Sequence, residues 1–258
     1  MALPVHPKMA LSCATVAPLS AARVAAIAVT VDLAASGPSG QTGTATGDTS
    51  VGTDRFFGGV TSVRGSGFDD SLSGSNNAAN TAEQFNGGAG NDTIDGRGGF
   101  DRVQYSSFVD DTTTGGVTVS LAAGTATGDA SVGTDTLRSV EAVRGSNFAD
   151  IYDARNFTAS GTNAGSAGVN ANGAAFNEFE GMSGNDTIVG NGNTRISYQN
   201  ATGGVTVNLS SPDASQTYLT LTQTGITTGD SSVGTDRIYR SSSRTSKRSP
   251  LSATPTTR

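Results

Sequence analysis

The sequence predicts an all-β fold in which short strands stack into a β-helix-like solenoid. Blocks such as VTVDLAA at 29–35 return along the chain, as VTVSLAA at 117–123 and VTVNLSS at 205–211. These blocks alternate apolar and polar residues and are rich in β-branched residues, which favours half-buried strands. No segment between the glycines keeps the i, i+3, i+4 apolar spacing of a helix. One such module cannot bury its apolar face alone, so stacking on its neighbours is expected.

Further blocks recur between the VTV segments. GDTSVGTD at 47–54 returns as GDASVGTD at 128–135 and GDSSVGTD at 229–236, SVRGSGFDD at 62–70 matches AVRGSNFAD at 142–150, and GGAGNDTIDG at 87–96 matches GMSGNDTIVG at 181–190. The intervals between blocks differ, which is typical of strands joined by surface loops that tolerate insertion. We therefore divide the chain into an N-terminal segment (1–28), three repeat units (29–116, 117–204 and the shorter 205–236) and a tail (237–258) that we expect to be disordered.

Composition and charge exclude several classes of protein. The chain has 258 residues with 35 Gly, a single His (His6), a single Cys (Cys13) and a net charge of −6. A lone Cys excludes a disulfide framework, and a lone terminal His excludes a His-based zinc motif or catalytic triad in the repeats. We therefore expect no enzyme. An acidic body with basic residues gathered in the tail is a poor nucleic-acid binder, and no apolar run is long enough to span a membrane.

The segment GGAGNDTIDGRGGFDRVQ divides into two nonapeptides, 87–95 and 96–104. Each has Gly at positions 1 and 4, Asp at position 6 and an aliphatic residue at position 8, which are Ile94 and Val103. The spacing predicts six residues of turn followed by three of strand, with position 8 in the core. Glycine supplies the positive φ values of such turns, and turn carbonyls beside carboxylates form an oxygen-only site that suits Ca²⁺.

The segment GGAGNDTID resembles the glycine-rich nonapeptide of the repeats-in-toxin (RTX, hemolysin-type) calcium-binding proteins. The resemblance covers roughly residues 29–236, with good copies at 87–95 and 181–189 and a partial copy at 96–104. It implies a parallel β-roll with eighteen residues per turn and calcium between successive loops on one edge. The metal ligands that it implies come from Asp70, Gly88, Gly90, Asp92, Gly99, Asp101, Asp150, Gly184 and Asp186.

The implied stacking makes specific demands on the loops. GSGFDD at 65–70 lies 22 residues before the loop that starts at Gly87, so four extra residues on the opposite edge would place Asp70 under Asp92. GSNFAD at 145–150 lies 36 residues before GMSGND, which allows either two further turns or one long excursion.

Some recurring residues have simpler interpretations. A Gly-Thr-Asp turn before a strand explains Asp54, Asp135 and Asp236 without metal. Tyr105 and Tyr198 are expected to be strand residues that cover an edge.

The sequence thus predicts a calcium-binding structural or adhesive module of a secreted, bacterial-type protein, with folding coupled to Ca²⁺ and cell-surface or matrix ligands as partners. The alternatives are a calcium-independent β-solenoid adhesin passenger and the non-catalytic tail of a secreted hydrolase. Residues 1–28 resemble a secretion signal only weakly, and both ends depart from the repeat pattern, so we expect the chain to be a fragment or a frame-shifted piece of a longer repeat protein.

Overall fold

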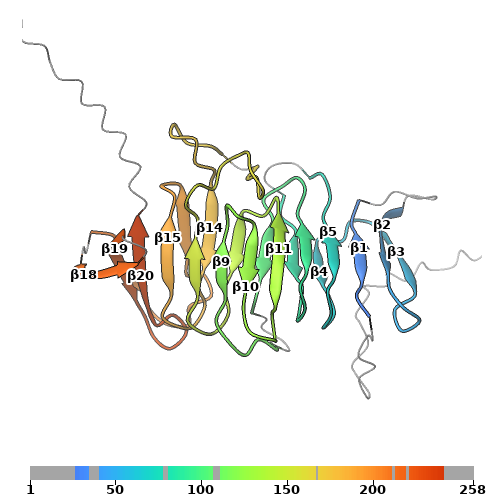
Figure 1. Cartoon of the computed structure of the whole chain (residues 1–258), viewed down its shortest axis with the longest axis horizontal. Coiled ribbons are helices and arrows are strands. Elements are labelled where there is room, and N and C mark those ends of the chain that lie inside the picture. Colours follow the sequence, from blue (N-terminus) through green and yellow to red (C-terminus); the bar gives the residue numbers. More distant parts are fainter. Residues whose placement is uncertain are drawn as a thin grey trace, which may run out of the picture.

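The described part of the chain is built from β-strands alone. The computed structural model describes residues 27–34, 41–77, 81–106, 111–166, 168–210, 213–218 and 221–240. None of these residues forms a helix, so no helix there could cross a membrane, and the all-β prediction is confirmed. The predictions for residues 1–26 and 241–258 lie outside the described residues. Figure 1 shows the strands side by side along the long axis, with the N-terminal strands β1–β3 at one end and the C-terminal strands β18–β20 at the other.

The described strands form two sheets, one of 14 strands and one of 6. Sheet A contains β1 (Thr30–Asp32), β2 (Gln41–Thr46), β3 (Thr53–Phe57), β5 (Ser71–Ser73), β7 (Thr93–Asp95), β9 (Thr118–Ser120), β10 (Thr125–Thr127), β11 (Thr134–Arg138), β13 (Ile151–Asp153), β15 (Thr187–Gly190), β17 (Thr206–Asn208), β18 (Asp213–Tyr218), β19 (Leu221–Thr228) and β20 (Thr235–Arg240). Sheet B contains β4 (Ser62–Arg64), β6 (Gln84–Asn86), β8 (Arg102–Gln104), β12 (Ala142–Arg144), β14 (Asn177–Glu180) and β16 (Thr194–Ser197).

The chain alternates between the two sheets. We call a sheet B strand, the loop after it and the next sheet A strand a rung; β4–β5, β6–β7, β12–β13 and β14–β15 are rungs. Successive rungs pair in parallel and in register, so that Ser71 lies beside Thr93 in sheet A and Ser62 beside Gln84 in sheet B. Equivalent positions of successive rungs therefore lie next to one another along the molecule.

Sheet A is mixed rather than purely parallel, which departs from the predicted roll. Each VTV strand, and each strand that begins at the Thr of an SVGTD block, pairs antiparallel with a middle strand. The result is the meanders β1–β2–β3, β9–β10–β11 and β17–β19–β20. The SVGTD blocks close the second hairpin of each meander, where Gly128 N–H donates to the Gly133 carbonyl at 2.9 Å. The middle strands were missed because Thr-rich and Gly-rich segments between two blocks are also typical of loops.

The core is a thin apolar layer between the two sheets. Leu72 and Ile94 from sheet A and Phe85 and Val103 from sheet B are fully buried, which confirms the prediction for position 8 of the nonapeptides. The ring of Tyr152 stacks on Phe179 with centroids 4.7 Å apart.

The end of the predicted tail also belongs to the sheet. β20 runs to Arg240 because Ile238 and Tyr239 are buried, so residues 237–240 were wrongly assigned to the tail.

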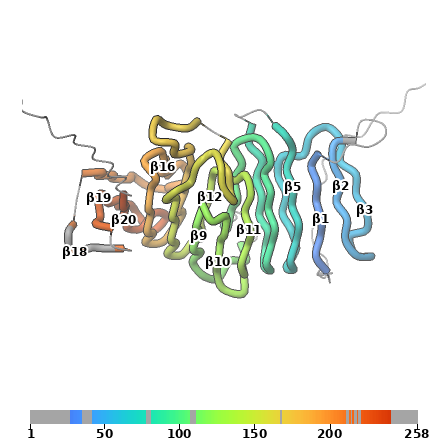
Figure 2. Tube along the Cα trace, turned by 45° about the horizontal axis from the view of Figure 1, so that its top comes forward, coloured from blue at the N-terminus to red at the C-terminus, as the bar shows by residue number. Residues whose placement is uncertain are grey.

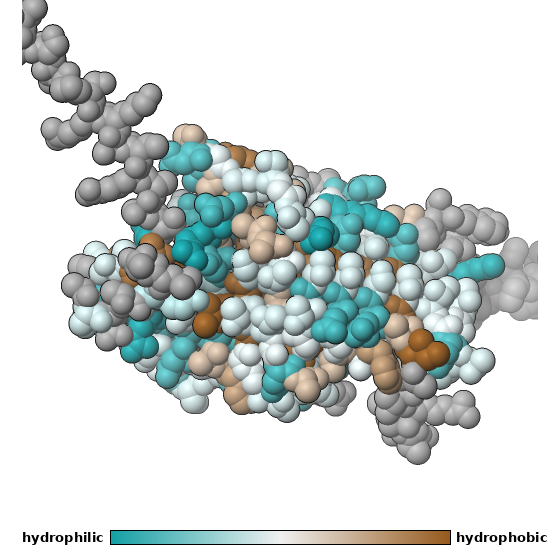
Figure 3. All heavy atoms as spheres, in the orientation of Figure 1, coloured by the Kyte–Doolittle hydropathy of each residue, from teal (hydrophilic) through white to brown (hydrophobic). Residues whose placement is uncertain are grey.

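The outer face of sheet A is polar. Thr30, Ser71, Thr93 and Thr136 occupy successive strands in one row, and the face shown in Figure 3 is mainly pale or teal, with brown in narrow seams. Because strand alternation sends every second residue outward, these hydroxyl-bearing residues mark the solvent side of the sheet.

The two edges of the stack differ in regularity. On one, which we call the aspartate edge, six-residue loops 65–70, 87–92, 145–150 and 181–186 lead from sheet B to sheet A. The opposite edge takes the insertions: the segment between β5 and β6 is longer than the segment between β7 and β8 one rung later, as predicted. The 36-residue interval is absorbed by one long excursion, 154–176, which protrudes as the gold loops of Figures 1 and 2.

Candidate metal centre

The first ladder of carboxylates on the aspartate edge consists of Asp70, Asp92 and Asp135. The N–H of Asp70 donates to Asp92 Oδ1 at 2.8 Å, and the N–H of Asp92 donates to Asp135 Oδ1 at 3.0 Å. The N–H of Val29, at the start of β1, donates in turn to Asp70 Oδ1 at 2.6 Å. Parallel pairing brings these residues together from points 22 and 43 apart in the chain, so Asp70 stacks with Asp92 as predicted.

The second ladder repeats this arrangement with Asp150, Asp186 and Asp236. The N–H of Asp150 donates to Asp186 Oδ1 at 2.9 Å, and the N–H of Asp186 donates to Asp236 Oδ1 at 3.1 Å. Val117, at the start of β9, donates its N–H to Asp150 Oδ1 at 2.8 Å. All six aspartates of the two ladders are at most 3% exposed. The structure therefore stacks acidic side chains in an interior that water does not reach.

The third ladder lies on the opposite edge and consists of Glu83, Asp101 and Glu141. The N–H of Glu83 donates to Asp101 Oδ1, and that of Asp101 to Glu141 Oε2, both at 2.9 Å. Asp101 is thus separated from the other predicted site residues, because its loop leads from sheet A to sheet B. Sequence reasoning missed Glu83 and Glu141, although Glu83 stands 18 residues before Asp101, one turn of the implied roll.

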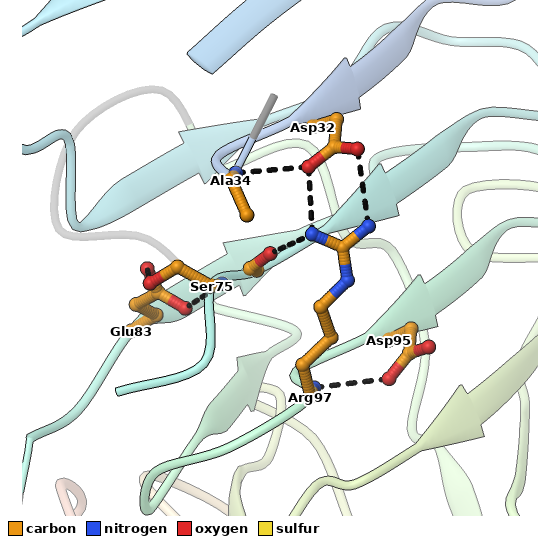
Figure 4. A network of polar contacts seen from close by, with 7 residues as sticks. Asp32, Ala34, Ser75, Glu83, Asp95 and Arg97 are labelled. Carbon is orange, nitrogen blue, oxygen red and sulfur yellow. Dashed lines mark hydrogen bonds and ion pairs between the residues drawn. The ribbon is translucent and has the colours of Figure 1, made fainter. Parts of the chain in front are cut away.

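Neighbouring groups on this edge satisfy part of the third ladder. Ser75 donates its N–H to Glu83 Oε2 and its hydroxyl to Oε1, both at 2.8 Å. Arg97 pairs with Asp32, its Nη1 lying 2.7 Å from Oδ1 and its Nη2 3.0 Å from Oδ2 (Figure 4). Arg97 thus links the turn after β7 to the end of β1. The carboxylate of Glu83, in contrast, accepts hydrogen bonds from the hydroxyl and the main-chain N–H of Ser75.

Burial raises the pKa of most ladder carboxyls, because the charged form is deprived of water. Desolvation is the largest cause for each. It raises the pKa of Asp92 and Asp101 to about 7, and that of Asp135, Asp150 and Asp236 to about 6. The pKa of Asp186 rises to about 9, because the charges of Asp150 and Asp236 add to its desolvation. The pKa of Glu141 is also raised by burial. Without a counter-charge, therefore, the carboxyls with a raised pKa keep their protons to a higher pH than free carboxyls do.

Three ladder oxygens have no hydrogen-bond partner within the described residues. They are the Oδ2 atoms of Asp92, Asp101 and Asp186, one at the centre of each ladder. A buried carboxylate oxygen without a donor loses its hydration without compensation and calls for an explanation, such as a bound proton or cation. These are also the aspartates at position 6 of the three nonapeptides, so the sequence motif and the unsatisfied atom coincide.

The predicted glycines adopt the backbone that the motif requires. Gly88, Gly90, Gly99 and Gly184 all have positive φ, from 103° to 145°. A Cβ on Gly88 would overlap the carbonyl oxygen of Ser66 in the rung before, and one on Gly184 that of Phe148. Glycine is thus required at these two positions both by conformation and by the close stacking of neighbouring loops. Their role as carbonyl ligands stays a prediction.

The SVGTD aspartates contribute more to the site than the turn interpretation allows. Asp135 and Asp236 are buried ladder members, whereas Asp54 is exposed on β3. Tyr105 donates its hydroxyl to Asp135 Oδ2 at 3.0 Å, and Tyr198 to Asp236 Oδ2 at 2.9 Å. Tyr105 and Tyr198 lie directly after β8 and β16, so the prediction that they are strand residues is wrong. Each hydroxyl instead donates to the last carboxylate of a ladder. The signal for this pairing is the Tyr that follows both nonapeptide copies in the sequence.

The donor chemistry fits a hard cation. Across the described residues, no three acidic, His or Cys side chains converge on one point, because each ladder sets its carboxylates one above another. A cation at Asp92 or Asp186 would meet the unpartnered Oδ2, a carboxylate oxygen of the kind that Ca²⁺ prefers. Such a charge would offset the desolvation that raises the pKa values.

Comparison with known proteins adds no relative to this chain. Neither a protein-family model nor a curated protein matches it.

Proposed function

We propose that this chain is a calcium-binding structural or adhesive module of a secreted protein, wound as an RTX-like β-roll whose folding is coupled to Ca²⁺. The observation that carries the proposal is the unpartnered, buried Oδ2 of Asp92 and Asp186. These oxygens lie in glycine-rich GND loops, where the pKa of both carboxyls is raised. A divalent cation supplies the counter-charge that the ladders otherwise lack.

Energetics favour coupling between metal and fold. Ordering each residue costs roughly 1–2 kcal/mol, and glycine lies at the high end of that range. The thin apolar core offsets only part of this cost, and stacked carboxylates repel one another. A cation that binds only the folded chain stabilises it by RT ln(1 + [Ca]/Kd), about 2.7 kcal/mol at a hundred times Kd. Extracellular calcium modules bind Ca²⁺ with dissociation constants of ~10⁻⁴–10⁻³ M, which fits a module that folds fully only outside the cell.

The test is far-UV circular dichroism of the full chain during a calcium titration, with magnesium as the control ion. We expect β signal to rise with calcium near millimolar concentration and to respond little to magnesium. Asp92→Ala combined with Asp186→Ala should abolish the response. A β spectrum that is complete in chelator, and that calcium leaves unchanged in both spectrum and melting temperature, would refute the calcium proposal.

A second candidate is a calcium-independent β-solenoid adhesin passenger. The observation that favours it is that every central ladder carboxylate already accepts a main-chain N–H, as Asp92 does from Asp70. In that case protons rather than calcium neutralise the ladders, and the same titration distinguishes the two candidates. Neither candidate includes catalysis, and both place the chain at the cell surface or outside the cell.

A further inference from the structure

One end of the stack, formed by β16 and β17, repeats an interior surface of the same protein. We call it the end face. Its two strands come from RISYQ and VTVNL, which correspond to RVQYS and VTVSL in β8 and β9. The hydrogen bond from Tyr198 to Asp236 beside it matches that from Tyr105 to Asp135. The end face therefore presents the same strand types that β8 and β9 present inside the stack.

In the interior, that surface is covered by the rung β12–β13. β12 pairs in parallel with β8, placing Val143 beside Val103, and β13 pairs in parallel with β9, placing Tyr152 beside Val119. The rung buries Val119 and Leu121 completely. Its loop also supplies Asp150, which accepts the N–H of Val117 at 2.8 Å. One twelve-residue rung thus pairs with the edges of two strands and accepts the main-chain N–H of Val117.

At the end face, the matching groups are open. Among the described residues, β17 pairs only with β19, and β16 only with β14. Val207 is 47% exposed and Leu209 67% exposed, whereas their interior equivalents are fully buried. Gly204 has no atom near the position of a Cβ, while a Cβ on the equivalent Gly116 would overlap the Ala149 carbonyl oxygen. Within the described part of the chain, the strand pairings, the buried side chains and the close approach at Gly116 that the interior rung provides have no counterpart at the end face.

We propose that the end face binds one further rung: a strand–GSxFxD turn–strand segment of another polypeptide, with the pattern of residues 142–153. Its first strand pairs with β16, its second pairs with β17, and its turn aspartate accepts the N–H of Val205, as Asp150 does from Val117. Continuity with the interior β8–β9 interface identifies this occupant, because that interface is the same surface in its filled state.

A second copy of this chain does not supply the occupant. Its rungs of this type are β4–β5 and β12–β13. β5 already lies between β1 and β7, and β13 between β9 and β15. Both sheet A strands are therefore paired on their two edges. The partner is therefore a different polypeptide that carries the same pattern.

The experiment titrates the full chain into a fluorescein-labelled peptide of residues 142–153, AVRGSNFADIYD, and follows fluorescence anisotropy. Calcium is kept at the level where circular dichroism shows a folded chain, so a failure of the calcium proposal cannot imitate a failure of binding. We expect saturable binding, and a scrambled peptide should not bind. Leu209→Ser should weaken binding about tenfold, since a buried leucine contributes that much to affinity. The replaced leucine is exposed, so the variant keeps its fold.

Register is tested by disulfide trapping in the Cys13→Ser background. Thr206→Cys should crosslink to the peptide carrying Ile151→Cys, because the equivalent Thr118 pairs with Ile151. Thr53→Cys on β3 is the control and should not crosslink, since the β11 edge to which β3 corresponds pairs with a β7-type strand. The proposal is overturned by absence of saturable binding up to millimolar peptide, by binding that Leu209→Ser leaves unchanged, or by equal trapping at both positions. It is also overturned if sedimentation shows a dimer that Leu209→Ser dissociates, because the occupant is then a second copy.

Discussion

The two GND loops, 87–92 and 181–186, share a motif and a backbone but differ in electrostatics. In both, the central aspartate accepts an N–H from the rung before and donates its own N–H to an SVGTD aspartate. Yet the pKa of Asp92 rises to about 7 and that of Asp186 to about 9. Desolvation is the largest cause at both sites, and at Asp186 the charges of Asp150 and Asp236 follow it directly. A shared motif therefore fixes the backbone, while the neighbouring rungs set the charge state.

The largest expected effect is the pH dependence of stability in chelator. The folded pKa values lie above the ordinary value of 3.8, so the folded state holds more protons than the unfolded state. Stability from these groups is complete below about pH 4 and is lost as pH rises through the folded values. We expect the free energy of unfolding to fall by about 5 kcal/mol or more between pH 5 and pH 9, since each group contributes up to about 1.4 kcal/mol per pH unit.

Far-UV circular dichroism in chelator at pH 5, 7 and 9, with urea unfolding wherever β signal is present, measures this loss. The loss of stability from the first ladder should be complete by about pH 7, and that from the second ladder by about pH 9. These limits follow the pKa values of Asp92 and Asp186. Millimolar calcium should flatten the profile. If stability in chelator is constant or rises with pH, the claim that the ladder carboxylates are buried without a counter-charge is wrong.

The next effect tests whether the two loops share a backbone. Gly90→Val and Gly184→Val each place a side chain at positive φ (121° and 125°) against the rung before. We expect both to lower the free energy of unfolding by about 3–5 kcal/mol, from backbone strain and steric overlap together. Gly192→Ala is the control, with φ of 91° in open space, and should cost only about 1 kcal/mol. Unequal losses at Gly90 and Gly184, measured by denaturant unfolding, would show that the loops differ in more than charge.

A smaller effect isolates the charge difference. Asp92→Asn and Asp186→Asn remove the ionisable group but keep an oxygen that can accept the main-chain N–H. In chelator both should stabilise the fold. The gain at Asp186 should exceed that at Asp92 by about 1–3 kcal/mol at pH 9, because one pKa unit corresponds to about 1.4 kcal/mol. Below pH 7 the two gains should be equal. Thermal unfolding at both pH values checks this, and equal gains at pH 9 would remove the distinction between the ladders.

The smallest effect concerns the opposite edge. Arg97 and Asp32 are each about one-third exposed, with side-chain accessibilities of 27% and 35%, so their ion pair is screened by water. Arg97→Gln should cost about 0–1 kcal/mol, and high salt should reduce the difference. A loss above 2 kcal/mol would mean that this turn contributes to the fold as strongly as the aspartate edge. Arg155→Gln, at the partly exposed pair with Asp153, serves as the control.

Local spacing predicted much of the fold and part of the site. The alternation in VTVDL and the aliphatic residues Ile94 and Val103 identified strands and core, because period-two patterning is readable from one sequence. The stacking of Asp70 on Asp92 followed from loop length. The middle strands of the meanders escaped prediction because their segments mix Thr with Gly and lack a clear apolar alternation, which is also typical of loops. Glu83 and Glu141 escaped because their ladder is assembled by pairing between rungs, which no local motif records.

The meanders also bear on how the chain finds its structure. β10 pairs with β9 and β11 within a segment of about twenty residues, whereas the two ladders of the aspartate edge join residues 22 to 50 apart. Local hairpins form in roughly microseconds, while distant pairing must first overcome the entropy of closing long loops. Each meander can therefore form early and offer a ready edge on which the slower parallel strands assemble. The chain carries its own nucleation sites, spaced along the stack, so folding can begin at several points and spread outward from each.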